Sequence, residues 1–243
     1  MMPTVAILAG GTATRLRPVT ATIPKAMLPV VGRPFIAHQL DLLRKNGIEN
    51  VVICSGYLSR QIEDFVKDGA EFGLNIIFSV DGDKLLGTGG AVKKALRLLE
   101  ETFFVMYGDS YLTADFAAIY EHFIAQGKSG LMTVFKNRGA WDSSNIVFKN
   151  GEIISYDKKN RSDDMEYIDY GLGILRKSAF DAFLDKDTFD LSELYQEMIR
   201  RRQLSGYEVP ERFYEIGSLS GLTETERFIS EILKQEKDNE RLR

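Results

Sequence analysis

The segment "LAGGTATRLRPVTATIPKAMLP" joins a pair of glycines to three cations within a short stretch of chain. Because Gly10 and Gly11 carry no Cβ atom, their backbone N–H groups can approach an anion closely. A guanidinium such as that of Arg15 or Arg17 binds two oxygens at once, and the ammonium of Lys25 supplies a compact charge. These residue types at this spacing predict a site for a triphosphate or pyrophosphate group.

The same segment departs from the two best-known glycine-rich phosphate signatures. A Walker A loop requires a lysine followed by Ser or Thr, whereas Arg15 is followed by Leu16. A dinucleotide fingerprint requires glycine at the position that Ala13 occupies. A strand-to-helix turn with solvated basic residues is therefore the alternative interpretation of this segment taken alone.

Two carboxylates follow strand-like segments and could hold a metal ion. Asp109 follows the apolar run "FFVMYG", at the expected carboxyl end of a buried strand, and Glu215 lies in "FYEIGS". Mg²⁺ in phosphoryl-transfer sites is commonly held by one or two carboxylates together with substrate phosphates. The alternatives are a turn or helix N-cap for Asp109 and a solvent-facing charge at a strand end for Glu215.

Histidine and cysteine chemistry fits this sequence poorly. The two histidines, His38 and His122, lie in segments with an amphipathic helical pattern, which favours structural roles for both. Catalytic Ser-His-Asp or Cys-His groups and poly-histidine metal sites are therefore not expected. The single cysteine, Cys54, excludes an intrachain disulfide and a multi-cysteine zinc site.

Short apolar runs alternate with helical patterns over the first part of the chain. Strands are expected at residues 4–9, 50–54, 75–80 and 102–109, and helices at 34–47, 59–67 and 91–100. This alternation predicts a mostly parallel sheet covered on both faces. The glycine-bearing loops at 10–11, 87–90 and 108–109 all follow strands, so we expect them to converge on one crevice at the carboxyl ends of the strands.

The pattern changes after about residue 130. Further strands are expected at 130–135, 145–148, 152–158 and 167–175, and helices at 191–202 and from Ser218 onward. Asn150-Gly151 is a strong hairpin signal between the second and third of these strands. No linker, repeat or low-complexity segment interrupts the chain, which predicts a single domain over residues 1–243.

Composition limits the classes of partner. The chain has 243 residues, 44% hydrophobic and 27% charged, with a net charge of −4. This balance provides no electrostatic footprint for nucleic acid or for an anionic membrane surface, so a polyanionic substrate must be attracted by a local basic cluster. The opening "MMPTVAILAGG" has no basic leader and no apolar run long enough to span a bilayer, which favours a cytoplasmic protein. The sequence leaves the oligomeric state open, and a homo-oligomer is among the states it allows.

Several motifs together resemble one enzyme family. "LAGGTATRLRPVT" followed by "PKAMLPVVGRP" resembles the signature of the sugar-1-phosphate nucleotidylyltransferases, the nucleotide-sugar pyrophosphorylases. "LGTGGA" is similar to their second nucleotide loop, "YGDS" to their metal-binding Gly-Asp, "DKK" to their sugar-phosphate lysine segment and "FYEIGSLSGL" to their closing motif. The resemblance spans nearly the whole chain and is nearest to the heptose- or mannose-1-phosphate guanylyltransferase-like branch.

The resemblance implies an α/β fold of the Rossmann-like, three-layer α/β/α type with a mostly parallel mixed sheet. It implies a nucleotide-binding half at about residues 1–112 and a sugar-phosphate-binding half at about 113–243. The implied reaction converts a nucleoside triphosphate and a sugar-1-phosphate into a nucleotide-sugar and pyrophosphate, by Mg²⁺-dependent in-line attack on the α-phosphate. The sugar phosphate is already largely dianionic at neutral pH, so no general base is needed, in agreement with the shortage of histidine.

Site residues follow from the resemblance position by position. The catalytic residues are Arg15, Lys25 and Asp109. The nucleotide-binding residues are Ala9, Gly10, Gly11, Thr12, Asp81, Thr88 and Gly89. The sugar-phosphate-binding residues are Asn145, Lys158, Asp169 and Gly171. The metal ligands are Asp109 and Glu215.

Two departures from the family pattern accompany this assignment. Ala13 replaces a glycine and Glu215 replaces an aspartate. Neither change removes a charge, so we expect an active enzyme in which Ala13 has a negative φ. GTP with heptose- or mannose-1-phosphate is the favoured substrate pair, and a UTP- or CTP-dependent member is the alternative.

Two functions from other classes fit the sequence less well than the enzyme. A non-catalytic sensor of nucleotide-sugars with the same fold could lose Arg15, Lys25 or Asp109, and all three are present. A nicotinamide-dependent dehydrogenase would need the third glycine of its fingerprint and an acid about 20 residues beyond it, and the sequence has neither.

Overall fold

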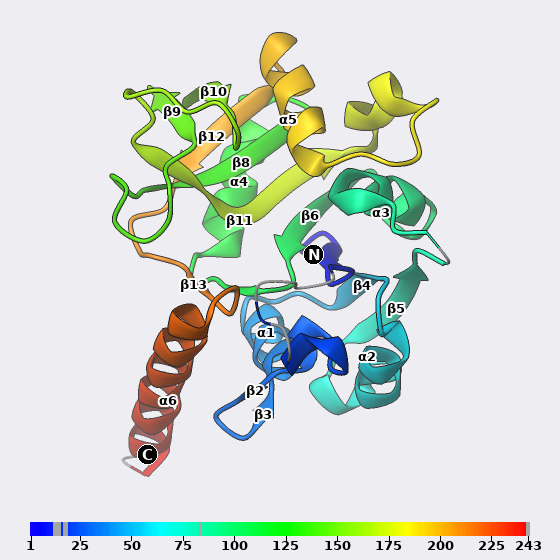
Figure 1. Ribbon diagram of the computed structural model, residues 1–243, viewed down its shortest axis with the longest axis vertical. Helices are drawn as coiled ribbons and strands as arrows, with labels where there is room; N and C mark the ends of the chain where they lie inside the picture. Colours follow the sequence, from blue (N-terminus) through cyan, green and yellow to red (C-terminus); the bar gives the residue numbers. More distant parts are fainter. Residues whose placement is uncertain (12–15, 17–18, 83, 242–243) are drawn as a thin grey trace.

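A nine-stranded mixed sheet runs through the molecule (Figure 1). The computed structural model describes residues 1–11, 16, 19–82 and 84–241. The strands of the sheet, in spatial order, are β5 (Asn75–Val80), β4 (Asn50–Ser55), β1 (Val5–Leu8), β6 (Thr102–Tyr107), β11 (Tyr167–Arg176), β8 (Gly130–Lys136), β12 (Leu204–Glu208), β10 (Glu152–Tyr156) and β9 (Ile146–Lys149). Two small sheets pair β2 (Pro29–Val30) with β3 (Arg33–Pro34) and β7 (Ser110–Tyr111) with β13 (Tyr214–Glu215).

The sheet changes character at β6. The four strands from the first part of the chain are all parallel, with Val5 paired to Val51 on one side and to Phe104 on the other. Beyond β6, strand β11 runs antiparallel to both β6 and β8, and only β12 returns to a parallel pairing, with β8. The carboxyl ends of β1, β4, β5 and β6 therefore meet at one edge, where the sequence places its glycine-bearing loops.

Helices cover both faces of this sheet. The α-helices are α1 (Phe35–Lys45), α2 (Ser59–Val66), α3 (Gly87–Ala95), α4 (Phe116–Gln126), α5 (Leu191–Arg200) and α6 (Leu219–Arg241). The 3₁₀ segments are η2 (Val19–Ala21), η3 (Lys25–Met27), η4 (Ala70–Phe72), η5 (Leu96–Leu98) and η6 (Lys177–Phe183). On one face Ile7 and Ile53 belong to a core that α1, α2 and α4 complete, and on the other Ala6 and Val52 pack with α3, η6 and α5. This is the predicted three-layer arrangement, and the fold class is confirmed.

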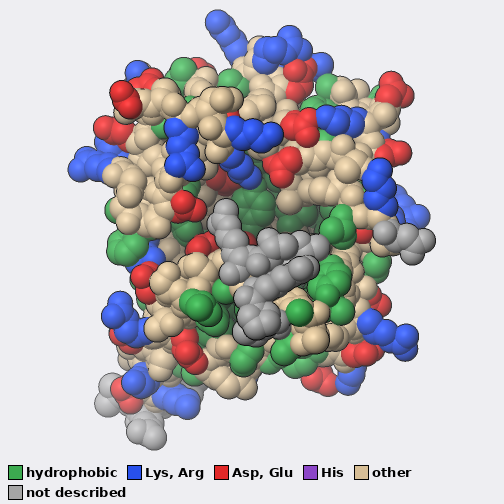
Figure 2. Space-filling view, viewed as in Figure 1, with side chains coloured by type: hydrophobic (Ala, Val, Ile, Leu, Met, Phe, Trp, Pro, Cys, Tyr) green, Lys and Arg blue, Asp and Glu red, His purple; other side chains and the backbone are tan. Residues whose placement is uncertain are grey.

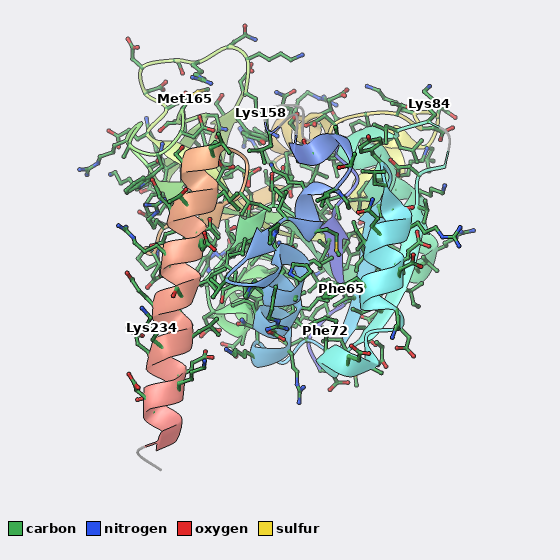
Figure 3. The ribbon with its side chains drawn as sticks, turned by 60° about the horizontal axis from the view of Figure 1, so that its bottom comes forward. Phe65, Phe72, Lys84, Lys158, Met165 and Lys234 are labelled. Carbon is green, nitrogen blue, oxygen red and sulfur yellow. The ribbon has the colours of Figure 1, made fainter. Side chains whose placement is uncertain are left out.

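An aromatic pair joins α2 to η4. Phe65 of α2 packs edge to face on Phe72 of η4, with ring centroids 6.0 Å apart, and both residues are labelled in Figure 3. Helix α6 packs differently, through a third cluster in which Ile229 joins Val30, Phe35 and Ile216. The C-terminal end of α6 extends past the rest of the molecule in Figures 1 and 3, and Glu236 near that end forms an ion pair with Lys45 of α1.

Most expected elements are present, and the differences from expectation include the start of α3 and strand β12. The helix predicted at 91–100 begins earlier, at Gly87, so "LGTGG" forms its first turns and not a loop. Strand β12 was not expected from the sequence. Asn150 and Gly151 both have positive φ, at 53° and 81°, as the predicted tight hairpin turn requires. Across the described part of the chain, no helix has the length and apolar character needed to cross a membrane.

Both histidines have structural surroundings. His38, on α1, is buried, and one of its ring nitrogens lies 2.8 Å from the carbonyl oxygen of Val30. Burial lowers the pKa of His38, which keeps the ring neutral at pH 7. His122, on α4, is half-buried and packs edge to face on Tyr207. Neither residue lines the cavity at the carboxyl ends of the strands.

Candidate active site

A cavity of about 350 Å³ opens where the parallel strands end. Gly10 and Gly11 line it after β1, Gly108 and Asp109 after β6, and Thr88 at the start of α3. The space-filling view shows a hollow on this face of the molecule, with apolar side chains on its floor (Figure 2). The predicted convergence of the three glycine-bearing segments on one crevice is confirmed.

An ion pair lies inside this cavity. The ammonium of Lys25 contacts a carboxylate oxygen of Asp109 at 2.6 Å, and the two side chains keep 20% and 34% of their surface exposed. Lys25 begins η3, and Asp109 follows the turn at the end of β6, so residues 84 positions apart meet. The pair brings a predicted phosphate-binding cation and a predicted metal-binding carboxylate into direct contact.

A buried glutamine fixes the turn that carries Asp109. Gln39, on α1, is fully buried, and its side-chain amide donates to the carbonyl oxygens of Tyr107 at 3.0 Å and Ser110 at 2.8 Å. These two carbonyls flank Gly108 and Asp109 in the chain. Sequence reasoning missed this residue, although a glutamine on the apolar face of a predicted amphipathic helix was the available signal.

The opening loop closely approaches the chain after β4, at Gly56, and the chain after β5, at Asp81. A Cβ atom on Gly10 would lie 3.3 Å from the backbone nitrogen of Gly56, so the two segments pack backbone to backbone there. Asp81, after β5, accepts a hydrogen bond from the backbone N–H of Leu86 and lines the same cavity as Ala9. Burial raises the pKa of Asp81, and the Leu86 hydrogen bond and the charge of Lys94 only partly offset that rise.

The glycines at the start of α3 serve packing. A Cβ atom on Gly89 would lie 2.3 Å from the ring of Phe189, and one on Gly90 would lie 2.2 Å from the carbonyl oxygen of Asp187. The backbone N–H groups of both glycines donate to the carbonyl oxygen of Phe189. Gly89 is thus placed against the 187–189 segment and does not line the cavity, whereas its neighbour Thr88 does.

Thr88 links this helix to α5. Its hydroxyl donates to Asp190 at 3.0 Å and accepts from the backbone N–H of Leu191 at 2.8 Å. Asp190 is the N-cap of α5 and also accepts from the backbone N–H of Ser192. Burial acts to raise the pKa of Asp190, but the hydrogen bonds from Ser192 and Thr88 and the charge of Lys158 together lower it. An ionised carboxylate therefore lies between the two helix starts.

Lys158 lies where the two halves of the molecule meet. Its ammonium is 3.8 Å from Asp190 and 5.7 Å from the ring centroids of both Tyr107 and Tyr156. Because Tyr107 also lines the cavity, this ammonium lies over a residue of the cavity wall.

Asp169 is half-buried near this lysine, and both of its carboxylate oxygens accept hydrogen bonds from the chain. One carboxylate oxygen accepts from the hydroxyls of Tyr107 and Tyr156, each at 3.2 Å, and the other accepts from the backbone N–H of Gly171 at 3.0 Å. Burial raises the pKa of Asp169, although the charge of Lys158 and these hydrogen bonds oppose the rise. The arrangement makes Asp169 a support for the two tyrosines that surround Lys158.

The remaining sugar-side residues lie around the same strand. Gly171 has a φ of +96° where the pairing of β11 with β8 is interrupted, and a Cβ atom there would lie 3.3 Å from the hydroxyl oxygen of Ser110. Asn145 accepts a hydrogen bond from the backbone N–H of Asp169 at 3.3 Å. Three of the four predicted sugar-phosphate residues are therefore joined by direct hydrogen bonds: Asn145, Asp169 and Gly171.

The two predicted metal ligands lie on adjacent chain segments. Glu215, on β13, pairs with Ser110 on β7, and the backbone N–H of Ile216 donates to the carbonyl oxygen of Asp109 at 2.9 Å. Glu215, however, lines a second cavity and not the one lined by Asp109. Within the described residues no group of three or more metal-ligating side chains is present. One or two carboxylates completed by substrate phosphates is the arrangement that Mg²⁺ commonly adopts, and the donors present fit it.

Four predicted features fall outside the described residues. They are the catalytic assignment of Arg15, the phosphate-site cation of Arg17, the nucleotide contact of Thr12 and the negative φ of Ala13. These stay predictions from the sequence.

Comparisons with known proteins agree with this geometry. The family profile described as Nucleotidyl transferase matches residues 4–232. The UTP–glucose-1-phosphate uridylyltransferase of Synechocystis is 30% identical over 212 residues, which cover 79% of this chain and 54% of that protein. The D-glycero-α-D-manno-heptose 1-phosphate guanylyltransferase of Campylobacter jejuni is 28% identical over 214 residues, which cover 87% of this chain and 93% of that protein.

Solved structures show the same fold at low sequence identity. A putative glucose-1-phosphate thymidylyltransferase from Bacillus anthracis has a TM-score of 0.83 and 22% identity, over 94% of this chain and 95% of that chain. HddC from Yersinia pseudotuberculosis complexed with GMP-PN has a TM-score of 0.79 and 24% identity, over 94% and 100%. The match over residues 4–232 shows that the chain belongs to the Nucleotidyl transferase family, as its resemblance to the sugar-1-phosphate nucleotidylyltransferases predicted.

Proposed function

We propose that this protein transfers a nucleotidyl group from a nucleoside triphosphate to a sugar-1-phosphate and releases pyrophosphate. The observation that carries the proposal is the Lys25–Asp109 contact inside the cavity, bordered by Gly10 and Gly11 and approached by Lys158 from the other half. A cation paired with a carboxylate inside the cavity, and a second cation over Tyr107, which lines that cavity, suit a reaction between two polyanions.

The reaction joins two negatively charged groups, and charge repulsion is its main difficulty. A phosphate oxygen of the sugar-1-phosphate forms a bond to the α-phosphorus while the bond from that phosphorus to the β-phosphate oxygen breaks. Pyrophosphate leaves with the electron pair of the broken bond. Because the attacking oxygen is already ionised at neutral pH, the protein needs to align and neutralise the reactants and not to remove a proton.

Each described residue has a distinct part in this proposal. Lys25 neutralises the α-phosphate region, and Gly10 and Gly11 leave room for phosphate oxygens to approach the backbone N–H groups. Lys158, supported by Tyr107 and Tyr156, binds the phosphate of the sugar. Arg15 contacts the departing phosphates by family resemblance alone.

Asp109 and Glu215 are the residues that would hold a divalent cation, which we propose to be Mg²⁺. When bound, the ion neutralises phosphate charge and polarises the reacting phosphoryl group. The donor set of carboxylates is of the hard oxygen type that Mg²⁺ prefers. The Lys25 ammonium at 2.6 Å from Asp109 holds that carboxylate within the cavity before substrate arrives.

The two halves of the chain divide the substrates in this proposal. Residues up to about 112 bind the nucleotide, and residues from about 113 bind the sugar phosphate. GTP with heptose- or mannose-1-phosphate is the favoured pair, because the Campylobacter relative named for that chemistry is matched over 93% of its length. UTP or CTP is the alternative, which the Synechocystis relative and a solved inositol-1-phosphate CTP transferase from T. maritima support.

The test is pyrophosphate release from four nucleoside triphosphates, each combined with a panel of sugar-1-phosphates and Mg²⁺. We expect turnover that requires both substrates and the metal, with GTP and heptose- or mannose-1-phosphate the fastest pair. Turnover with UTP or CTP and a sugar-1-phosphate, but not with GTP, would change the assigned base and leave the proposed reaction unchanged. Binding of a nucleotide-sugar without turnover for any pair would instead identify a non-catalytic sensor.

A further inference from the structure

A four-layer stack joins the loop after β8 to helix α6. The guanidinium of Arg212 lies 3.4 Å from the ring centroid of Trp141 and 4.5 Å from that of Tyr214. Tyr214 in turn stacks on Phe228 of α6, with centroids 3.8 Å apart and an interplanar angle of 12°. Arg212 is also paired with Glu224 of α6 at 2.8 Å. The only tryptophan of the chain is therefore fixed in place from one side.

The loop that carries this tryptophan has a defined internal structure. Asn137 is 2% exposed, accepts from the backbone N–H of Trp141 and donates to the carbonyl oxygen of Asp142. The hydroxyl of Ser144 accepts from both Asn137 and the backbone N–H of Gly139. Despite this internal bonding, Trp141 remains 52% exposed. A large aromatic group that is held rigidly yet left open on one face is well suited to binding a ligand.

The exposed indole borders a second cavity beside the candidate active site. This cavity has a volume of about 70 Å³, and Trp141, Asp142, Glu215, Ser218, Ser220 and Glu224 contribute to its lining. Its position is fixed by Glu215, which pairs with Ser110, the residue after Asp109. The backbone N–H of Ile216 reaches the carbonyl oxygen of Asp109 itself at 2.9 Å. The second cavity is therefore bordered by a segment that is hydrogen-bonded to the backbone of Asp109.

The chemistry of the lining indicates the kind of group that would enter. An indole face packs against the C–H face of a sugar ring, while carboxylate and hydroxyl oxygens bond to the ring's hydroxyl groups. The cavity lining includes three carboxylates, those of Asp142, Glu215 and Glu224, and Arg212 is its one described basic residue. That guanidinium is already paired with Glu224, and Asp142 adds a further negative charge, so a second anionic group on the ligand would be repelled.

We propose that Trp141 is a binding platform for the acceptor sugar and that the adjoining cavity takes a neutral, hydroxyl-bearing substituent of that sugar. The inference rests on the proposed function, since it assumes that a sugar-1-phosphate is the acceptor. Arg212 acts as a positioning residue, because it orients the indole and does not itself contact the sugar. The platform selects neutral sugars over sugar acids.

The lone tryptophan allows a test that needs no turnover. Glucose 1-phosphate and glucuronic acid 1-phosphate differ by one carboxylate, and inorganic phosphate lacks the ring. We expect a saturable change in tryptophan emission with glucose 1-phosphate, a response at least about tenfold weaker in apparent affinity with glucuronic acid 1-phosphate, and none with phosphate. Equal responses to glucose 1-phosphate and phosphate, or no response to either sugar, would overturn the platform.

Variants separate this inference from the proposed reaction. In Trp141→Ala the KM for the acceptor should rise about tenfold while the KM for the nucleotide stays constant, and Trp141→Phe should restore most of the loss. Arg212→Lys should behave like Trp141→Ala, because an ammonium cannot stack between two rings as a guanidinium does. Ile154→Ala, a change at a residue 51% exposed on β10, is the matched surface control.

Each outcome decides one of the two proposals. Turnover with an unchanged acceptor KM in Trp141→Ala would refute the platform and keep the enzyme. A ring-dependent emission change without turnover for any nucleotide would support the platform and refute the proposed activity. Circular dichroism of each variant excludes unfolding as the cause of a KM change.

Discussion

The side-chain amide of Gln39 donates a 2.8 Å hydrogen bond to the carbonyl oxygen of Ser110, and both residues are buried. A second bond to Tyr107 completes a bridge across the turn that presents Asp109. A single side chain from the core of α1 thus sets the position of a carboxylate that it does not touch. The relationship explains why a polar residue lies fully buried among apolar neighbours.

Replacing this glutamine should weaken catalysis more than folding. In Gln39→Leu the carbonyls of Tyr107 and Ser110 lose their donor, so Asp109 is less well placed and kcat should fall about tenfold to a hundredfold. A higher Mg²⁺ concentration should be needed for half-maximal rate. The control is His38→Leu on the same helix, which loses one buried contact to the carbonyl oxygen of Val30. We expect both variants to lose roughly 1–3 kcal/mol of unfolding free energy. Equal kcat values for the two variants would contradict the positioning role.

Asp109→Asn tests the central carboxylate directly. The change keeps the size of the side chain but removes the charge that pairs with Lys25, so turnover should fall on the order of a hundredfold or more. Pyrophosphate release measures the effect. Asp115→Asn is the control, because asparagine caps α4 as well as aspartate does and the rate should not change. A folded Asp109→Asn variant with the wild-type rate would refute the metal assignment.

Lys158 and its neighbour Lys159 form a matched pair for the acceptor side. Lys158→Met removes the cation that lies over Tyr107 and Tyr156, so the KM for the sugar-1-phosphate should rise about tenfold or more. The KM for the nucleotide should change little. Lys159→Met removes an adjacent charge for which the described structure gives no ion pair, and both constants should match the wild type. A larger rise in the KM for the sugar-1-phosphate in Lys159→Met than in Lys158→Met would assign phosphate binding to Lys159 in place of Lys158.

Gly11 and Gly90 should respond differently to the same substitution. Nothing described lies within 4 Å of a Cβ atom on Gly11, so Gly11→Ala should keep the melting temperature and raise the nucleotide KM about tenfold, because the methyl group occupies cavity space. In Gly90→Ala the methyl group meets the carbonyl oxygen of Asp187 at 2.2 Å. That variant should lose about 1–3 kcal/mol of unfolding free energy. Thermal melting and nucleotide kinetics are measured on both variants. A stability loss in Gly11→Ala and a raised nucleotide KM in Gly90→Ala would contradict the roles given to the two glycines.

The thiol of Cys54 should stay unreactive while the protein is folded. Burial, with a smaller contribution from Asp81, raises its pKa to about 12, whereas an unfolded cysteine has a pKa of about 8.5. Because the folded state keeps the proton longer, the unfolding free energy should fall as pH rises above about 8.5, by up to 1.4 kcal/mol, roughly, per pH unit.

Comparison with Cys54→Ala isolates this contribution. Between about pH 8.5 and 9.5 the wild type should lose stability faster than Cys54→Ala, because the variant has no thiol to ionise. Labelling of the wild type by a thiol reagent should follow the unfolded fraction. Rapid labelling under native conditions would show that the thiol is exposed.

Sequence patterns predicted the strand-helix order and the convergence of three loops because both depend on local features. Glycines after apolar runs mark strand ends, and Asn150-Gly151 marks a tight turn. The predicted start of α3 was wrong because glycines usually interrupt helices. Here Gly89 and Gly90 leave room for Phe189 and Asp187, about a hundred residues away in sequence. The sequence of the helix alone does not indicate these distant contacts.

Strand β12 and the Gln39 bridge depend on partners distant in sequence. Gly206 lies in the middle of β12, where the ring of Phe148 would be 2.5 Å from a Cβ atom, and a central glycine weakens a strand signal. Gln39 departs from the apolar pattern of the buried face of α1. Its hydrogen bonds to the carbonyl oxygens of Tyr107 and Ser110 explain why a glutamine occupies this position.

The contact between the start of α3 and the segment at Phe189 has a consequence for recombination with relatives. The first half of the chain contributes two glycines, and the second half contributes the aromatic ring and backbone carbonyls that fill the space above them. A chimera that took residues 1–112 from this chain and the remainder from a relative with another substrate would break this fit. Residues 86–90 and 187–191 therefore form one exchangeable unit, although they lie on opposite sides of any simple crossover point.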